Sequence, residues 1–397
     1  MTNFADTKAQ FHLPKGVIYL DGNSLGPLPK SAPDAVSSTL MDEWGEMLIR
    51  GWNRAGWMEQ PRVLADRIAR LIGAGDGTVV LGDTLSIKVF QAVSSALSLR
   101  PDRKIIISDT GNFPTDLYMT NGLIKSLDQN HDLKIVEPER VSDAVTDDVA
   151  VLLLTEVDYR TGRKHDMASL TKKAHEAGAL VVWDLAHSAG ALPVDLTGCD
   201  VDFAVGCTYK YLNGGPGAPA FIYVRPDLAE RVDPILAGWL GHQAPFDFDL
   251  NYHPGTGIDR FRVGTPPVLQ MAALSASMDI WDGVDMAAVR KKSQELTDLF
   301  IDEVERRCPD LVLASPRDSK QRGSQVSFQF ANGYAAMQVV IARGVIGDFR
   351  APDIMRFGFT PLFVDEQDVL SAAKTIETVM KNEEWQRPEF QVRSAVT

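Results

Sequence analysis

A lysine and an aspartate stand at the ends of two apolar runs, where they could do chemistry together. Lys210 follows the apolar run 202–206 and precedes the glycine-rich segment 213–217. An ammonium group at the edge of a hydrophobic core is costly unless it is used, and such a lysine can form a Schiff base with a carbonyl cofactor. Asp184 ends the apolar run 179–184. Pyridoxal phosphate needs a carboxylate that keeps its ring nitrogen protonated, so Lys210 with Asp184 predicts a site for this cofactor.

Polar clusters follow other apolar runs of the chain. Segment 83–86 precedes a predicted helix, whose free N–H groups could hold a phosphate, although helix capping alone explains it equally well. Phe113, in the loop 112–116, could stack on a flat ring, although a structural turn is the simpler interpretation. His187 would neighbour Asp184 if a helical turn follows that residue. Tyr209 offers a phenol for phosphate binding or proton transfer.

Three further residue types allow both a functional and a structural interpretation. Arg356, which has apolar neighbours in sequence, is a candidate clamp for a substrate carboxylate or a partner in a structural salt bridge. Trp52 and Trp57 lie among glycines and could form a ligand wall or an interface. Cys207 is expected inside a strand, where packing is a better explanation than a nucleophilic role.

The apolar runs between residues 75 and 225 predict the fold class. They are continuous rather than alternating, which indicates strands covered on both faces and therefore a mostly parallel sheet with crossover helices. Helices are predicted over 85–99 and 164–178. The predicted strands of this α/β core are 79–81, 105–107, 149–154, 179–183, 202–205 and 221–224.

After residue 280, the predicted helices and strands follow an α+β pattern. A long amphipathic helix over 286–307 precedes short strands near 326–330 and 345–349, and a last helix is predicted over 365–381. The expected division is a segment 1–50 that joins the small domain, a large cofactor-binding domain 51–280 and a small domain 281–397.

Composition excludes several other classes of function. The net charge is −13, with 40 basic and 53 acidic residues, and no basic cluster offsets it, which argues against nucleic acid and anionic lipid as partners. Three cysteines at irregular spacing give neither a disulfide framework nor a metal-ligand pattern. The N-terminal residues lack the features of a signal peptide and no apolar stretch approaches a membrane span, so a cytoplasmic protein is expected.

Several motifs in this order resemble those of kynureninase, a fold type I pyridoxal phosphate enzyme of the aspartate aminotransferase-like class. The resemblance runs from residue 20 to at least residue 365 and rests on separate segments of the sequence. These segments are 19–26 (YLDGNSLG), 113–116 (FPTD), 184–187 (DLAH), 208–213 (TYKYLN), 238–242 (GWLGH) and 261–267 (FRVGTPP).

The resemblance implies a role for each candidate residue. Lys210 would be the Schiff-base lysine and the base that moves the proton, Asp184 would pair with the ring nitrogen, and Tyr209 would complete the catalytic set. Arg356 would bind the substrate α-carboxylate. The remaining implied cofactor contacts are Leu85, Ser86, Phe113, Thr115, Asp116, Thr155, His187, Trp239 and Thr265.

In the family, the residues matching Trp239 and Thr265 reach the phosphate from the neighbouring subunit, which implies a homodimer with shared active sites. Animal members have histidine where this chain has Trp52 and asparagine where it has Thr265. These positions line the aryl end of the substrate. Tryptophan and threonine there resemble the bacterial branch, which favours unsubstituted kynurenine over the 3-hydroxy compound.

The implied reaction is hydrolytic Cβ–Cγ cleavage of L-kynurenine to anthranilate and L-alanine, within tryptophan breakdown and NAD biosynthesis. Two alternatives remain open on the sequence. One is another enzyme of the same fold, such as a class V aminotransferase or a cysteine desulfurase. The other is a non-catalytic ligand-binding protein that keeps the fold, which the intact set of Lys210, Asp184 and Tyr209 disfavours.

Overall fold

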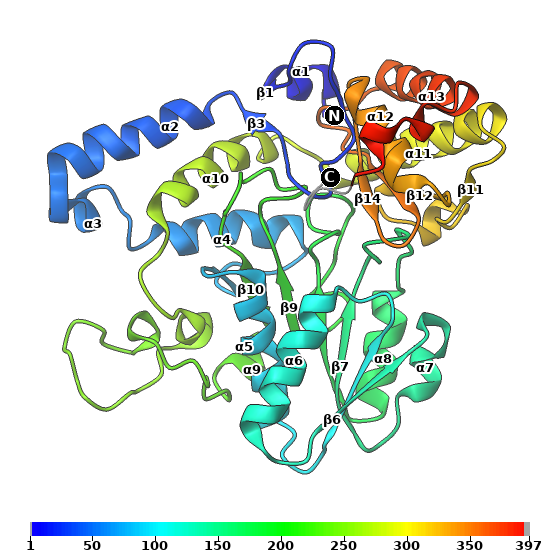
Figure 1. Cartoon of the computed structure of the whole chain (residues 1–397). Helices are drawn as coiled ribbons and strands as arrows, with labels where there is room; N and C mark the ends of the chain where they lie inside the picture. Colours follow the sequence, from blue (N-terminus) through cyan, green and yellow to red (C-terminus); the bar gives the residue numbers. More distant parts are fainter. Residues whose placement is uncertain (1, 393–397) are drawn as a thin grey trace.

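A seven-stranded sheet forms the centre of the structure, a computed structural model that describes residues 2–392 (Figure 1). Its strand order is β4-β10-β9-β8-β7-β5-β6. Strand β10 is antiparallel to both of its neighbours, and the other six strands run parallel. The predicted α/β class with a mostly parallel sheet is therefore confirmed. The strands are β4 (Val79–Leu81), β5 (Ile105–Asp109), β6 (Asp132–Val136), β7 (Val149–Thr155), β8 (Leu180–Asp184), β9 (Phe203–Gly206) and β10 (Phe221–Val224).

Helices cover both faces of this sheet, as the continuous apolar runs require. Every residue of β7 is buried, and its side chains divide between two hydrophobic cores. One core contains side chains of α5 (Leu85–Ser98) and α6 (Pro114–Leu127). The other contains side chains of α4 (Gln60–Leu71) and α8 (Met167–Glu176). A strand buried on both faces cannot alternate polar with apolar residues, which explains its sequence.

A second, four-stranded sheet follows in the C-terminal part of the chain, with the order β11-β12-β15-β14. All its neighbouring strands are antiparallel. The long helix α11 packs against α13, which begins with a capping box between Asp365 and Asp368. The elements are α11 (Met286–Arg307), β11 (Val312–Leu313), β12 (Gln325–Gln329), α12 (Gly333–Ala342), β14 (Asp348–Arg350), β15 (Ile354–Gly358) and α13 (Glu366–Lys381).

The N-terminal segment connects the two sheets. Strand β2 (Ile18–Tyr19) pairs in parallel with β13 (Val345–Ile346), and the chain then reaches the loop after β9, where the Gly26 N–H donates to the Tyr209 carbonyl over 2.8 Å. A Cβ at Gly26 would lie 2.5 Å from the Asn213 Cα, so this approach requires glycine. Strand β2 thus pairs with a strand of the C-terminal part of the chain, and the assignment of residues 1–50 to the small domain stays a prediction. The boundaries at residues 50 and 280 stay a prediction.

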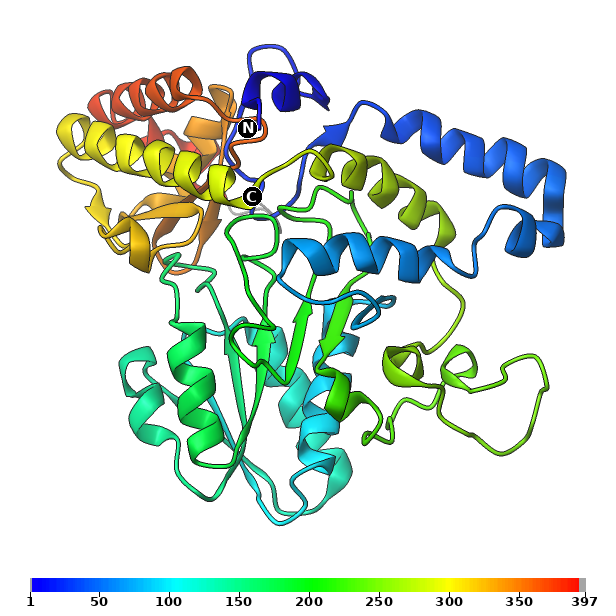
Figure 2. The same ribbon diagram turned by 180° about the vertical axis from the view of Figure 1, so that it is seen from behind.

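An arm and a loop project from the same side of the molecule, away from the four-stranded sheet (Figures 1 and 2). The arm consists of α2 (Ala32–Ser38), a π-helical turn (Thr39–Gly45) and α3 (Gly51–Arg54), and the loop lies between residues 240 and 257. Helix α10 (Val268–Trp281) packs against α2 and α4. Large apolar side chains are exposed on both projections: Leu40, Met41, Trp44, Leu48 and Ile49 on the arm, and Phe246, Phe248 and Leu250 on the loop.

Smaller elements complete the described chain. Strand β1 (Phe11–His12) pairs with β3 (Leu28–Pro29). The short helices are α1 (Phe4–Ala9), α7 (Val141–Ala144) and α9 (Pro226–Ala229). Within residues 2–392, none of the helices combines the length and the apolar character needed to cross a membrane.

A histidine near the start of β8, His175, makes the stability of the fold depend on pH. His175 Nε2 lies 2.8 Å from the buried Asp202 carboxylate, and this hydrogen bond, opposed by burial, raises the pKa of His175. A raised pKa stabilises the fold below the unfolded-state value, and the contribution is lost as pH rises through the folded-state pKa. We expect His175→Gln to lose about 1 kcal/mol of unfolding free energy near pH 6 and little near pH 9.

Denaturant unfolding at both pH values checks this expectation. The exposed His12 provides the matched control, because His12→Gln removes an imidazole from the surface. An equal loss for His175→Gln at both pH values would show that the imidazole acts through packing rather than through its charge.

Candidate active site

A cavity of about 530 Å³ opens at the carboxyl ends of the parallel strands. Ligands bind at this edge of open α/β sheets because the strand ends and the following helix N-termini present polar groups there. Nine residues singled out from the sequence line it together. They are Leu85, Ser86, Phe113, Thr115, Asp116, Asp184, His187, Tyr209 and Lys210.

Lys210 lies just after β9 and extends its ammonium group into the cavity. The residue is 9% exposed. Its Nζ atom is 3.4 Å from His187 Nε2 and 5.7 Å from the centre of the Phe113 ring. The backbone around it is fixed by a turn in which the Asn213 N–H donates to the Lys210 carbonyl over 2.9 Å. The lysine is thus held beside a flat apolar ring with its amine accessible from the cavity.

Two buried carboxylates share the cavity with this lysine. Asp184 ends β8 and accepts a hydrogen bond from the Ala186 N–H over 2.8 Å. Asp116, in the first turn of α6, is 0% exposed, and neither of its carboxylate oxygens has a hydrogen-bond partner among the described residues. Burial raises the pKa of both groups, and the nearby Asp184 adds to the rise at Asp116. Lys210 only partly offsets this effect of burial, and a protonated ring nitrogen beside the carboxylates would stabilise their charged form further.

The other titratable groups of the cavity remain uncharged at neutral pH. Burial, and then the nearby Lys210, lowers the pKa of His187 well below its usual range, so its imidazole is neutral. The Cys207 thiol, and then burial, raises the pKa of Tyr209, so its phenol keeps its proton. Tyr209 is therefore a neutral donor in the cavity.

The N-terminus of α5 forms the anion-binding end of the cavity. Thr84 precedes the helix in an extended conformation, and within the described chain its side chain makes no capping hydrogen bond. The first N–H groups of a helix have no partner within the helix, and the helix dipole favours negative charge there. Leu85 and Ser86 line the cavity at this point. A phosphate group fits this end.

Thr155 lies outside the described lining of the main cavity. It ends β7 beside Asp184, and its hydroxyl donates to the Val157 carbonyl over 3.2 Å. A contact between Thr155 and the cofactor stays a prediction.

Arg356 lies behind the cavity wall in a buried ionic cluster. It is 1% exposed, and its Nε donates to Asp348 Oδ1 over 2.7 Å. Its Nη1 donates to the Tyr159 carbonyl and its Nη2 to Ser24 Oγ, both over 2.7 Å. Ser24 itself lines the cavity. The arginine thus reaches the cavity through the Ser24 hydroxyl, and its salt bridge to Asp348 shows that the structural interpretation also applies.

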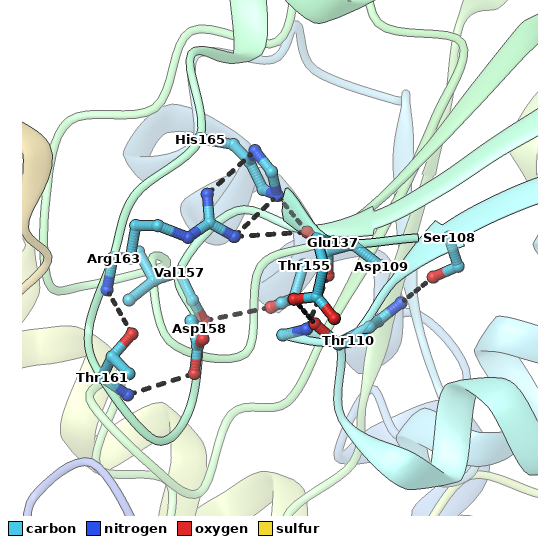
Figure 3. Close-up of polar contacts among 12 residues, drawn as sticks. Ser108, Asp109, Thr110, Glu137, Thr155, Val157, Asp158, Thr161, Arg163 and His165 are labelled. Atoms are coloured by element: carbon cyan, nitrogen blue, oxygen red, sulfur yellow. Dashed lines mark hydrogen bonds and ion pairs between the residues drawn. The ribbon is translucent and has the colours of Figure 1, made fainter. Parts of the chain in front are cut away.

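A hairpin-like segment, residues 156–165, links the cofactor end of the cavity to this cluster. Its Tyr159 ring packs edge-to-face on Phe113, with the ring centres 5.1 Å apart, while the Tyr159 carbonyl binds Arg356. Figure 3 shows the base of the segment, where Arg163 and His165 converge on Asp109. The distances from Asp109 Oδ2 are 2.6 Å to His165 Nε2 and 3.2 Å to Arg163 Nη2. This buried cluster anchors the segment to the end of β5.

Three sequence-predicted residues lie together but outside the main cavity. Trp52, Trp239 and Thr265 line a second cavity of about 260 Å³ between the arm and the loop that project from the molecule. Trp52 belongs to α3, and not to an irregular segment as its neighbouring glycines suggest. Trp239 is 46% exposed. Within one chain, these residues are therefore separated from Lys210.

Cys207 corrects one expectation from the sequence. Strand β9 ends at Gly206, so Cys207 is the first residue after the strand, and it lines the cavity. It is 3% exposed, and burial raises the pKa of its thiol. A protonated, buried thiol is a poor nucleophile, which favours packing over a nucleophilic role even though Cys207 lies outside the strand.

The sequence did not identify two residues of the ionic cluster. Ser24 stands in the first of the recognised motifs without an assigned role, and Asp348 stands on a short strand of the second sheet. Pairing of β14 with β15 sets Asp348 opposite Arg356. The apolar neighbours of Arg356 in the sequence indicate that it is buried and needs a counter-ion, but they do not identify the carboxylate that provides it.

Comparison with solved structures places the fold. The cysteine desulfurase CsdA from Escherichia coli superimposes with a TM-score of 0.81 at 20% identity, covering 96% of this chain and 99% of that one. A cysteine desulfurase from Thermococcus onnurineus NA1 also gives a TM-score of 0.81, at 18% identity, with coverage of 96% and 99%. At such identities the match shows the shared fold alone.

Comparison of sequences is more specific. The model of the kynureninase C-terminal domain matches residues 289–376. A kynureninase of Burkholderia pseudomallei (strain 1106a) is 50% identical over 400 residues, which cover 99% of this chain and 96% of the relative. A kynureninase of Pseudomonas fluorescens is 48% identical, with coverage of 100% and 97%. The expected relationship is confirmed: this chain belongs to the kynureninase family.

Proposed function

We propose that the chain is a pyridoxal phosphate-dependent kynureninase that hydrolyses the Cβ–Cγ bond of L-kynurenine to anthranilate and L-alanine. The near-full-length identity to kynureninases favours this activity over that of an aminotransferase or a desulfurase. The observation that carries the proposal is the cavity, where Lys210 lies with two buried carboxylates, one of which, Asp116, has no hydrogen-bond partner among the described residues. A non-catalytic protein would have no reason to maintain that arrangement, because buried polar groups without partners are costly.

The cavity residues fit pyridoxal phosphate on four independent grounds. Lys210 offers an amine for its carbonyl carbon, and the N-terminus of α5 offers N–H groups for its phosphate. The buried Asp184 carboxylate offers a counter-charge for its ring nitrogen, with Asp116 close by. Phe113 supplies a flat surface beside Lys210. When bound, the cofactor supplies an electron sink for negative charge that develops at the substrate α-carbon.

The protein side chains then move protons at defined atoms. Lys210 Nζ, as a free neutral amine, takes the proton from the substrate α-carbon and returns it, because it is the amine that lines the cavity. A water molecule adds to the aryl ketone before the carbon–carbon bond breaks. The Tyr209 phenol, which keeps its proton at neutral pH, assists this addition as a general acid at the ketone oxygen. His187 stays neutral beside Lys210 and so adds no competing charge.

The second cavity supports a homodimer with shared active sites. Trp239 and Thr265 are not among the residues that line the Lys210 cavity of their own chain, and exposed apolar side chains surround them on the projecting arm and loop. In an isologous dimer, such a surface meets its own copy. Trp239 and Thr265 would then reach the phosphate of the partner, and Trp52 with Thr265 would line the aryl end of the substrate. We place the enzyme in the cytoplasm, in the kynurenine pathway of tryptophan catabolism.

The test is direct. Purified holoenzyme is incubated with L-kynurenine while the fluorescence of released anthranilate is recorded. Release of anthranilate together with stoichiometric L-alanine is expected, and release of a keto acid or of a persulfide would instead identify an aminotransferase or a desulfurase. Parallel assays with 3-hydroxykynurenine should give a lower kcat/KM, as the residues Trp52 and Thr265 suggest.

Co-expression of two inactive variants tests the shared site. Lys210→Ala disables the site of its own subunit, whereas Trp239→Ala is expected to disable the site of its partner. A statistical mixture contains half heterodimers with one intact site each, so activity should recover to about one quarter of the wild-type value. Each variant expressed alone provides the control. Recovery no greater than the sum of the separate activities would show that each site takes Trp239 and Lys210 from the same subunit.

A further inference from the structure

Two arginines, and not one, meet at the edge of the cavity. Arg356 on β15 and Arg350 at the end of β14 both contact Asp348, with Arg350 Nη2 2.7 Å from Asp348 Oδ2. Both also donate to the Ser24 hydroxyl, Arg356 over 2.7 Å and Arg350 over 3.2 Å. Because Ser24 lines the cavity, this hydroxyl is the point where the two guanidinium groups approach the substrate space.

Most donors of Arg356 are already in use. Its Nε binds Asp348, its Nη2 binds both Asp348 and Ser24, and its Nη1 binds the Tyr159 carbonyl. One N–H of the five remains, whereas a bidentate grip on a carboxylate takes two. Arg356 alone therefore cannot make two hydrogen bonds to a carboxylate unless its bond to the Ser24 hydroxyl is broken.

Arg350 has the donors that Arg356 lacks. Its Nε is buried and has no hydrogen-bond partner among residues 2–392, while its side chain is 32% exposed. Its charge also acts within the cavity, because Arg350 and Arg356 both contribute, after burial and Lys210, to the lowered pKa of His187. Arg350 reaches the edge of the cavity through its Nη2 contact with the Ser24 hydroxyl, and this contact places it near an anion bound there.

The charge of the cluster calls for such an anion. Burial opposes the ionisation of Asp348, but Arg356 outweighs it and holds the pKa of that carboxyl below its usual range. Burial, and then Asp348, raises the pKa of the adjacent Asp21 to about 8, so Asp21 is largely protonated at neutral pH. Two guanidinium groups thus face one carboxylate. The surplus is one positive charge, which is costly to bury unpaired.

We propose that Arg350 is a second guanidinium for the substrate α-carboxylate, acting beside Arg356, and that Asp348 and Ser24 are positioning residues for the pair. This inference rests on the proposed function. On binding, one N–H of each arginine passes from the Ser24 oxygen to the carboxylate. Asp348 keeps the guanidinium of Arg356 oriented, because its carboxylate accepts hydrogen bonds from both Nε and Nη2 of the arginine.

The test compares ligands with and without a carboxylate. Arg350→Gln should raise the KM for L-kynurenine about 10-fold to 100-fold with a smaller change in kcat, because the lost interaction is made with substrate and transition state alike. Arg350→Lys keeps the charge and should recover part of the loss. Arg317→Gln, on the surface of the same C-terminal part, is the matched control. Thermal unfolding of each variant shows that it folds.

A binding titration separates this inference from the proposed function. The cofactor absorbance of the holoenzyme is followed during titration with L-alanine and with ethylamine, which is alanine without its carboxylate. Arg350→Gln should weaken the response to L-alanine about 10-fold or more and leave the response to ethylamine unchanged. Equal changes for both ligands, or none, would overturn the role of Arg350. Absence of anthranilate release by the wild type would overturn the proposed function. The titration would still show whether Arg350 binds the carboxylate of the ligand.

Discussion

Replacing Lys210 with alanine is expected to reduce anthranilate release by at least about 10⁴-fold, because one side chain supplies both the covalent anchor and the proton transfer. The visible absorbance of the cofactor imine should disappear from the purified protein. Both are measured on the same preparation, by fluorescence with L-kynurenine and by an absorbance spectrum.

Lys172→Ala is the matched control for this variant. Lys172 is a surface lysine of α8, with a side chain that is 79% exposed, so its removal should change neither activity nor spectrum. A Lys210→Ala enzyme with full activity would refute the assignment of the catalytic lysine and with it the proposed chemistry.

Replacing Asp184 with asparagine should have the second largest effect. The amide removes the negative charge that would face the protonated ring nitrogen, and a loss of about 10²–10³-fold in kcat is expected, as for other preorganised electrostatic contacts. Asp184→Glu keeps the charge and should retain more activity. Steady-state kinetics with L-kynurenine, together with the cofactor content of each variant, measure the effect.

The exposed Asp147 serves as the control position, where asparagine should be neutral. If Asp184→Asn were as active as the wild type, the counter-charge of the ring nitrogen would have to come from the other buried carboxylate, Asp116. The double variant would then identify it, because a cavity without either carboxylate has no counter-charge left.

Part of the interior of the fold could be predicted from the sequence, but β15 was not predicted although all five of its residues are buried. Strand β7 and helix α11 follow directly from apolar runs and helical periodicity, and the bounds of α11 match the prediction. Strand β6 was missed because its residues are mostly exposed and include Asp132 and Lys134. Nothing in the apolar run of β10 indicates that it is antiparallel to its neighbours, since direction depends on the connection between strands.

Some residues of the candidate site could also be predicted from the sequence, and others could not. Residues directly after buried strands, such as Lys210 and Asp184, could be placed because strand ends of a parallel sheet meet at one edge. The partners of Arg356 could not, because Ser24 and Asp348 are 324 residues apart in the sequence and join only when the N-terminal segment meets the second sheet. Long-range pairing of this kind leaves no local pattern to read.

The pairing of β2 with β13 also determines when the N-terminal segment can fold during synthesis of the chain. Ile18 pairs with Val345, which is 327 residues later in the sequence (345 minus 18). At a synthesis rate of roughly 5–20 residues per second, the N-terminal strand waits roughly 16 to 65 seconds for its partner. The large sheet can form on the ribosome in that interval, but the wall that contains Ser24 closes only after the second sheet has emerged. Truncation in the last quarter of the chain would therefore leave the cavity open on the side of the substrate carboxylate.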